Sequence, residues 1–264
     1  MNGGKTMKTK FKWLKSLIVG IMILTLFMVT FPLNAFASEL IDTKLAKRNY
    51  PIQLIQEMTT EEKENLISDD CYFESSKTYS LDENCNLLNV NNDKDIATIG
   101  IIKDEHLRIT LTTSKNRDDC TVVSFHYYWK QLPVNRLQDP ICLGWDSSVF
   151  RYKTNSFRSE DQYRKIYNGP VYTHSKNTKA ADVKSNYISW FADLKGYTAT
   201  PVELFGYAMI TLQPQKRQKS TQLYLQYVHS KLSAVPSISF QNGNFTVGAG
   251  KSYDYWSDAF DVTS

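Results

Sequence analysis

The feature that most constrains this chain is a series of short runs, from about residue 95 to the C-terminus, in which apolar and polar residues alternate. Alternation with a period of two is typical of β-strands that bury one face. Polar turn segments separate the runs, and no ten-residue helical pattern lies between them, which argues against βαβ units. The sequence therefore predicts a mainly β fold, an antiparallel β-sandwich or a partly open barrel. The runs are 96–104, 106–115, 120–130, 140–152, 169–176, 186–194, 202–213 and 221–232.

The segment SISFQNGNFTVGAG, residues 237–250, gives the sharpest local prediction. Asn242 and Gly243 can adopt the positive φ angles of a two-residue type I′ turn. Phe240 then falls opposite Phe245, and this register places apolar residues on one face and polar residues on the other. We expect a β-hairpin here.

The N-terminus has the order of a secretory signal. Five lysines precede an apolar run over 17–31, and an Ala-x-Ala site ends at Ala37. This arrangement predicts a signal peptide over 1–37, cleaved after Ala37, and a secreted, extracellular protein. An uncleaved membrane anchor is the alternative, because the run is only slightly shorter than the roughly 18 residues that suggest a span.

Removing this segment changes the charge of the chain. The whole sequence has 31 basic and 27 acidic residues, but without the five lysines 26 basic and 27 acidic residues remain, a net charge of −1. The basic character belongs to the signal, so nucleic acid is not an expected partner. Within the remainder, acids gather over 60–104 and bases over 150–184; these regions either lie side by side or leave a basic face for a polyanion.

Residues 38–70 are polar and helix-prone. In MTTEEKENLI, Thr59 is followed three residues later by Glu62, which is the pattern of a capping box that opens a helix. We therefore expect a helical N-terminal arm over 38–70, attached to an antiparallel β domain over 71–264.

Four cysteines, Cys71, Cys85, Cys120 and Cys142, follow the signal segment. An even number in an oxidising compartment predicts two disulfides, with three pairings possible. The pairing Cys71–Cys85 and Cys120–Cys142 closes the two shorter loops. None of the four has the surrounding signature of a catalytic cysteine.

The stretch YDYWSDAFD, residues 253–261, is the first candidate binding site. As a strand it places Asp254, Trp256 and Asp258 on one face, as a sugar-binding strip would require. As a helix it makes the acids a solvated stripe. The preference of aromatic residues favours a strand, which we expect to lie against the hairpin at Asn242.

The strand at 120–130 contains a second candidate. Alternation sends Phe125 and two further aromatic residues into the core and leaves an exposed polar-aromatic row of His126, Tyr128 and Lys130. Of these, Tyr128 is the residue that we expect to contact a ligand.

Metal and cofactor motifs are not apparent. The four histidines lack the spacing of ligands on one strand or helix. An EF-hand-like pattern over 82–93 has Leu87 where the loop needs glycine, and it ends on Asp93 rather than glutamate. The sequence therefore predicts no metal, no cofactor and no catalytic residue.

The leading hypothesis is a secreted β-rich protein that binds an extracellular ligand, an envelope glycan or a surface protein. A hydrolase acting on polysaccharide is one alternative, with Asp146 and Asp258 working beside Trp145 and Trp256. A membrane-active β-rich toxin is another, and a membrane is an expected partner only in that case. The sequence leaves the oligomeric state open.

Overall fold

The computed structural model describes residues 38–92, 104–166, 171–195, 203–216, 219–231, 237–248 and 252–264. The predicted signal over 1–37 and most of the strand expected at 96–104 lie outside these residues, as does Asp93. No helix within the described ranges is both long and apolar enough to cross a membrane.

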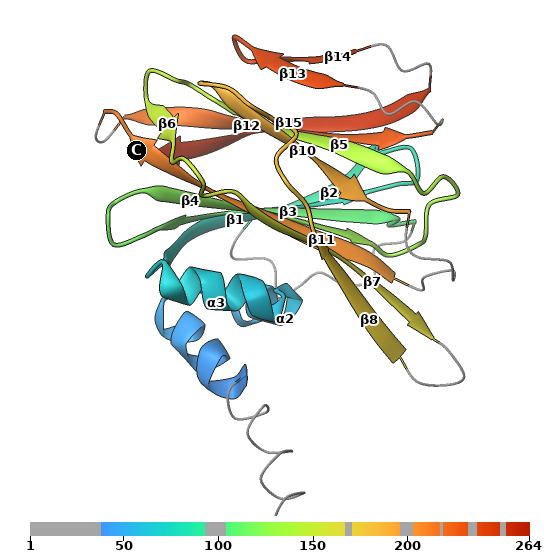
Figure 1. The fold of residues 1–264 in the computed structure, drawn as a ribbon, viewed down its shortest axis with the longest axis horizontal. Coiled ribbons are helices and arrows are strands. Elements are labelled where there is room, and N and C mark those ends of the chain that lie inside the picture. The colour runs from blue at the N-terminus through green and yellow to red at the C-terminus, as the bar shows by residue number, and fades with distance from the viewer. Residues whose placement is uncertain are drawn as a thin grey trace, which may run out of the picture.

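The fold is an antiparallel β-sandwich with a small helical N-terminal part, as the alternation predicts (Figure 1). Sheet A has the strand order β2-β1-β3-β4-β11-β7-β8, with β6 also paired to β11, and sheet B has the order β15-β12-β5-β10-β9. The strands of sheet A are β1 (Tyr72–Leu81), β2 (Leu87–Asn92), β3 (Leu107–Lys115), β4 (Thr121–Trp129), β6 (Phe150–Tyr152), β7 (Arg158–Ile166), β8 (Val171–Asn177) and β11 (Glu203–Pro214). Those of sheet B are β5 (Gln138–Trp145), β9 (Asp182–Val183), β10 (Tyr187–Asp193), β12 (Ser220–Ser230) and β15 (Tyr253–Thr263).

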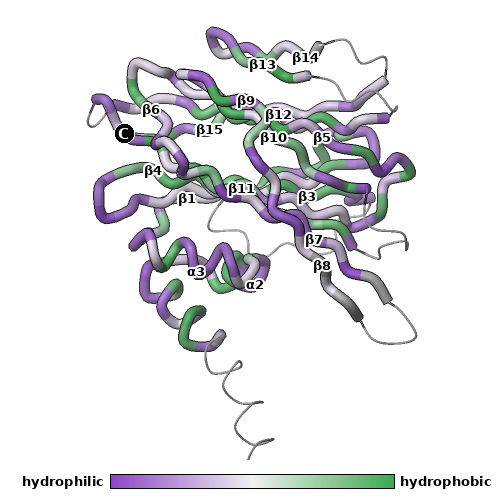
Figure 2. The backbone as a smooth tube through the Cα atoms, in the orientation of Figure 1, coloured by the Kyte–Doolittle hydropathy of each residue, from purple (hydrophilic) through white to green (hydrophobic). Residues whose placement is uncertain are grey.

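The core lies between the two sheets and holds large aromatic side chains. Phe125, Tyr127 and Trp129 of β4 all point into it, as their alternation predicts, and Trp145 enters from sheet B. Figure 2 shows hydrophobic residues interspersed with polar ones along the strands. Burial of aromatic side chains removes more apolar area from water than any other residue type can.

A buried polar network ties the sheets together within this core. The fully buried Asp139 of β5 accepts hydrogen bonds from the Tyr227 hydroxyl and from the backbone N–H of Ser230, 3.0 Å away, and His229 Nδ1 lies 2.9 Å from it. The Tyr227 hydroxyl also accepts from Trp129 Nε1 of sheet A, at 3.2 Å. The carboxylate is thereby satisfied, as a buried charge must be.

The N-terminal arm covers the outer face of sheet A (Figure 1). It comprises a helix over 38–47, α2 (Ile52–Glu57) and α3 (Thr60–Ser68). Thr59 caps α3, and its side chain accepts a hydrogen bond from the backbone N–H of Glu62 at 3.2 Å, which confirms the predicted cap. Apolar residues of the arm bury themselves against β4 and β11; they are Leu45, Tyr50, Leu54, Ile55, Met58 and Leu66.

The hairpin at Asn242 and Gly243 is confirmed in its predicted register. β13 (Ile238–Gln241) pairs with β14 (Asn244–Val247), with Phe240 opposite Phe245. Asn242 and Gly243 have φ angles of 52° and 81°, as the turn requires. The hairpin forms a separate layer on the outer face of sheet B (Figure 1), and Phe240 lies directly over Gly144 of β5.

Residues 253–263 form strand β15, so the strand interpretation of YDYWSDAFD is confirmed. The expected neighbour is wrong, because β15 pairs with β12 along its whole length rather than with the hairpin. A four-residue hairpin strand offers few backbone partners, whereas β12 supplies an edge of eleven residues.

Strands β1 and β7 were not expected from the sequence. Both are rich in Ser, Thr or charged residues, and β7 (RSEDQYRKI) appears largely hydrophilic in Figure 2. Each strand sends only a few apolar side chains into the core, Tyr79 and Leu81 from β1 and Tyr163 from β7, and polar tertiary contacts supply the rest. In β7, the buried Asp161 accepts hydrogen bonds from the Tyr127 hydroxyl at 2.8 Å and from the backbone N–H of Asp193 at 3.0 Å.

The predicted disulfides are not formed, since all four cysteines are free and buried. Cys71 and Cys85 lie at opposite ends of β1, about 30 Å apart for a ten-residue strand, far beyond the roughly 7 Å limit between bridged Cα atoms. Cys120 precedes β4 in sheet A, whereas Cys142 lies under the hairpin on the outer face of sheet B. Cysteines that are close in the sequence are therefore far apart in the folded chain.

We expect the folded protein to react very slowly with a thiol reagent at neutral pH, because only the thiolate reacts and burial raises the pKa of Cys71 to about 12. After denaturation without reductant, a colorimetric thiol assay should detect all 4 cysteines. A smaller number of thiols in the denatured chain would mean that a disulfide forms.

We also expect Gly144→Val to displace the hairpin, because a Cβ atom at Gly144 would lie 2.5 Å from the Phe240 ring. The free energy of unfolding should fall by about 1–3 kcal/mol, the usual cost of overpacking. Urea denaturation measures the change. In a Phe240→Ala background the same substitution should cost much less, and equal costs in both backgrounds would contradict this packing.

Candidate functional site

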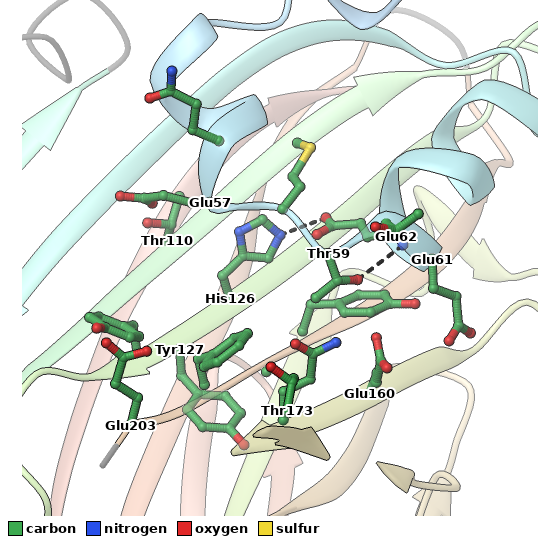
Figure 3. A pocket seen from close by; sticks show the side chains of 18 of the residues that line it. Glu57, Thr59, Glu61, Glu62, Thr110, His126, Tyr127, Glu160, Thr173 and Glu203 are labelled. Atoms are coloured by element: carbon green, nitrogen blue, oxygen red, sulfur yellow. Dashed lines mark hydrogen bonds and ion pairs between the residues drawn. The ribbon is translucent and has the colours of Figure 1, made fainter. Parts of the chain in front are cut away.

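A groove of about 960 Å³ runs between α3 and the outer face of sheet A (Figure 3). Its volume falls in the range of about 300–1,000 Å³ that is usual for ligand sites. Its floor comes from β3, β4, β7 and β11, and one wall comes from the end of α2 and the start of α3. The side chains used below are Glu57, Glu61, Glu62, Glu64, Arg108, Thr110, His126, Tyr128, Lys130, Glu160, Gln162, Arg164, Thr173, Glu203, Phe205 and Tyr207.

Strand register arranges the floor in rows. One row crosses β3, β4, β11 and β7 as Thr110, His126, Tyr207 and Glu160. The next row, two residues along each strand, consists of Arg108, Tyr128, Phe205 and Gln162. Side chains two residues apart point to the same face of a sheet, so both rows face the arm.

The arm is attached to the first row by an ion pair. His126 Nε2 lies 2.6 Å from Glu62 Oε1, and both residues are buried, with Glu62 fully covered (Figure 3). Glu62 occupies the capping-box position, and its backbone N–H donates to the Thr59 side chain. Its carboxylate, however, extends to His126 on the sheet. The cap and the ion pair therefore fix both the start of α3 and its position over β4.

The surroundings of His126 shift its pKa in opposing directions. Burial alone would lower the pKa, but the charge of Glu62 and the hydrogen bond to it outweigh burial, and Glu57 adds to their effect. The net result is a raised pKa for His126. The imidazolium form is thus favoured while α3 is docked.

Two partly exposed aromatic rings form the middle of the floor. The rings of Tyr128 and Phe205 lie on neighbouring strands with centroids 6.1 Å apart, and Lys130 Nζ lies 4.7 Å from the Tyr128 ring centre. Burial, with the charge of Glu203, raises the pKa of Tyr128 to about 12. Its hydroxyl therefore stays protonated and can donate a hydrogen bond.

Charges are distributed unevenly along the groove. At one end the cations are already paired: Arg108 binds Glu105 through two contacts of 2.9 Å, and Arg164 Nη1 lies 2.6 Å from Glu203 Oε2. At the other end Glu61 and Glu160 lie beside the Glu62–His126 pair (Figure 3). The groove thus has a neutralised end and an acidic end.

Of the residues predicted to bind a ligand, only Tyr128 lies in this groove. Trp145 is a core residue whose Nε1 donates to the Ser185 carbonyl at 3.0 Å. Asp146 follows β5 and caps a turn by accepting from the backbone N–H of Ser148, and its other oxygen lies 3.5 Å from Lys219 Nζ. The hydrogen bonds from Ser148 hold the pKa of Asp146 below its usual range.

The β15 residues do lie on one face, but that face is turned toward sheet A. Trp256 is buried, and its ring centroid lies 4.3 Å from that of Tyr79. Asp258 forms an ion pair with Lys77 at 2.7 Å, and Asp254 lies 2.5 Å from Lys231 Nζ. Trp256 is therefore packed in the interior, and Asp254 and Asp258 are each already paired with a lysine.

The sequence did not single out Glu61, Glu160, Phe205 or Tyr207. Alternation in 202–213 places Phe205 and Tyr207 on one face, which is a usable signal. Nothing comparable exists for Glu160, because the strand that carries it has no apolar period. Its position follows only from the pairing of β7 with β11.

No protein-family model and no curated protein matches the chain. Solved structures show distant similarity to the chain, among them these three. "BspA_C_mut" is 8% identical with a TM-score of 0.33, covering 60% of this chain and 55% of its own, so the chain spans about half of its length. Clostridium perfringens delta-toxin is 9% identical with a TM-score of 0.32, covering 73% and 89%. The C-terminal domain of the Streptococcus agalactiae AgI/II polypeptide BspA is 9% identical with a TM-score of 0.31, covering 75% and 76%. Similarities with TM-scores below 0.5 say nothing about the function of this chain.

The Glu62–His126 pair predicts a pH-dependent arm. A raised histidine pKa stabilises docking fully below pH 6.5, the ordinary value, and this contribution is lost as the pH rises through the raised value. Hydrogen exchange should therefore show weaker protection of α3 in alkaline than in mildly acidic buffer, after correction for intrinsic rates. Glu62→Gln should abolish this difference and lower the free energy of unfolding by about 1.5–3 kcal/mol, the worth of a charged hydrogen bond.

Glu64→Gln is the matched control, since Glu64 is an exposed glutamate of the same helix. It should leave the pH dependence intact. An unchanged pH dependence in Glu62→Gln would rule out this pair as its source.

Proposed function

We propose that the chain binds an extracellular carbohydrate, a short stretch of polysaccharide, in the groove between α3 and sheet A. The observation that carries the proposal is the pair of partly exposed rings, Tyr128 and Phe205, in the floor of an open groove with polar walls. A sugar ring has an apolar C–H face and a rim of hydroxyls. It therefore needs an aromatic surface together with hydrogen-bonding side chains.

The polar side chains of the groove fit the second requirement. Gln162 of β7 is paired with Phe205 of β11, and Thr173 of the next strand, β8, also lines the groove. The guanidinium groups of Arg108 and Arg164 are held in place by Glu105 and Glu203. Groups that are fixed before binding lose little conformational entropy when a ligand arrives, which favours affinity.

The proposal replaces the sugar strip expected on β15. Trp256 packs on Tyr79 and has no free face for a ring to stack on. It also favours a binding protein over a hydrolase, because Asp146 and Asp258 are engaged by Lys219 and Lys77. The signal sequence predicted over 1–37 supports a ligand outside the cell.

We expect Tyr128→Ala and Phe205→Ala each to weaken binding by about tenfold, or about 1.4 kcal/mol, because each removes one aromatic contact surface. The full-length mature chain would first be screened against an array of envelope polysaccharide fragments. Isothermal titration calorimetry on the best ligand then measures each variant.

Tyr255→Ala is the matched control, since Tyr255 is an exposed tyrosine on β15, far from the groove in the strand order. It should bind like the unmodified chain. Failure to retain any glycan would overturn the proposal, and so would equal losses for Tyr255→Ala and Tyr128→Ala. Release of dye from liposomes by the purified chain would support the membrane-active alternative instead.

A further inference from the structure

The acidic end of the groove carries charge that no described cation balances. Glu61, in the first turn of α3, and Glu160, on β7, point toward the same space (Figure 3). Arg158 is the cation whose charge reaches Glu61, but its guanidinium is bound to Asp69 at 2.9 Å. Neither Glu61 nor Glu160 forms an ion pair within the part of the chain that the structure describes.

A second observation concerns hydrogen bonding. Glu160 is only 5% exposed, and its Oε2 has no hydrogen-bond partner among the described residues. The same is true of Oε2 of the fully buried Glu62. Leaving a buried acceptor unsatisfied costs about 1–3 kcal/mol, and more when it is charged. A donor from a ligand would recover that energy.

The electrostatics agree with this geometry. Burial raises the pKa of Glu61, the charge of Glu160 raises it further, and a hydrogen bond from Tyr207 acts in the opposite direction. Two carboxylates that influence each other in this way repel each other. A positive charge placed between them would relieve the repulsion.

A metal ion fits the site less well than an organic cation. The described residues contain no group of three or more His, Cys, Asp or Glu side chains arranged to hold a metal. A primary ammonium group has three N–H donors and can be held by two or three carboxylate oxygens. The acidic end of the groove supplies carboxylate oxygens from Glu61 and Glu160.

We propose that this end of the groove is a subsite for the protonated amino group of an amino sugar. This inference rests on the proposed function, since the rest of the ligand would lie on Tyr128 and Phe205. Phe205 and Tyr207 are two residues apart on β11, so the aromatic row and the Glu160 row are separated by about 7 Å. One oligosaccharide can therefore contact both rows.

Two oligomers of glucosamine of equal length, one fully N-acetylated and one with free amino groups, test the proposal by calorimetry in mildly acidic buffer. The unmodified chain should bind the free-amine oligomer about tenfold tighter, because only that oligomer makes charge-assisted hydrogen bonds to the carboxylates. Glu160→Gln and Glu61→Gln should each remove this preference, with a much smaller loss of affinity for the N-acetylated oligomer than for the free-amine oligomer. Glu83→Gln should keep the preference, since Glu83 is an exposed carboxylate in the turn after β1 and does not line the groove.

The outcomes separate this inference from the proposed function. Equal affinity of the unmodified chain for both oligomers, with a loss in Tyr128→Ala, would overturn the ammonium subsite alone. If the chain binds neither oligomer, the ammonium subsite is also overturned. The proposed function would still stand if the chain binds a different glycan of the array. Glu160-dependent binding of an oligolysine peptide, without binding of the free-amine oligomer, would assign the site to a polypeptide and overturn the amino-sugar proposal.

Discussion

The groove depends on one contact, the buried ion pair between Glu62 of α3 and His126 of β4. Without it, the apolar residues of the arm would still cover part of the outer face of sheet A, but they would not fix where α3 lies. With it, α3 becomes a wall, and the first-turn carboxylate of Glu61 faces Glu160 across the floor. The apolar residues of the arm provide most of the burial, but they can slide along a sheet. The ion pair fixes one position of α3 on the sheet, because in any other position the Glu62 carboxylate would be buried without His126 as its partner.

The floor is positioned by a second set of buried polar contacts, which link the two sheets. Asp161 of β7 accepts a hydrogen bond from the backbone of Asp193 in sheet B, and burial raises the pKa of Asp161 to about 6. Residues alternate along a strand, so fixing Asp161 toward the interior turns Glu160 outward into the groove. A core contact thus determines where a site residue lies. The same logic holds for β4, where Trp129 reaches the Asp139 network through Tyr227 and Tyr128 faces outward.

The division of charge along the groove follows from these placements. Arg108 pairs with Glu105, just before β3, and with Glu57 of α2, and Arg164 pairs with Glu203 of β11, so both contribute oriented donors rather than free charge. Glu160 has no such partner within the described chain, since the neighbouring positions in its row are occupied by Tyr207 of β11 and Asn177 of β8. The groove consequently offers an aromatic centre between a neutral, hydrogen-bonding end and an acidic one. A neutral sugar chain that carries an occasional amino group matches that sequence of environments.

By itself the sequence determined the local structure. Alternation specified β4, β10, β11 and β12, Asn242-Gly243 specified a hairpin with its register, and Thr59 specified the start of α3, because each depends on residues close together in the chain. Tertiary structure alone decided that β7 is a strand, that β15 pairs with β12, that the four cysteines stay apart, and that Trp256 is buried. These features depend on which strands become neighbours. The groove belongs to this second group, since its residues come from seven elements spread over about 150 residues of sequence and meet only after the arm has folded back onto sheet A.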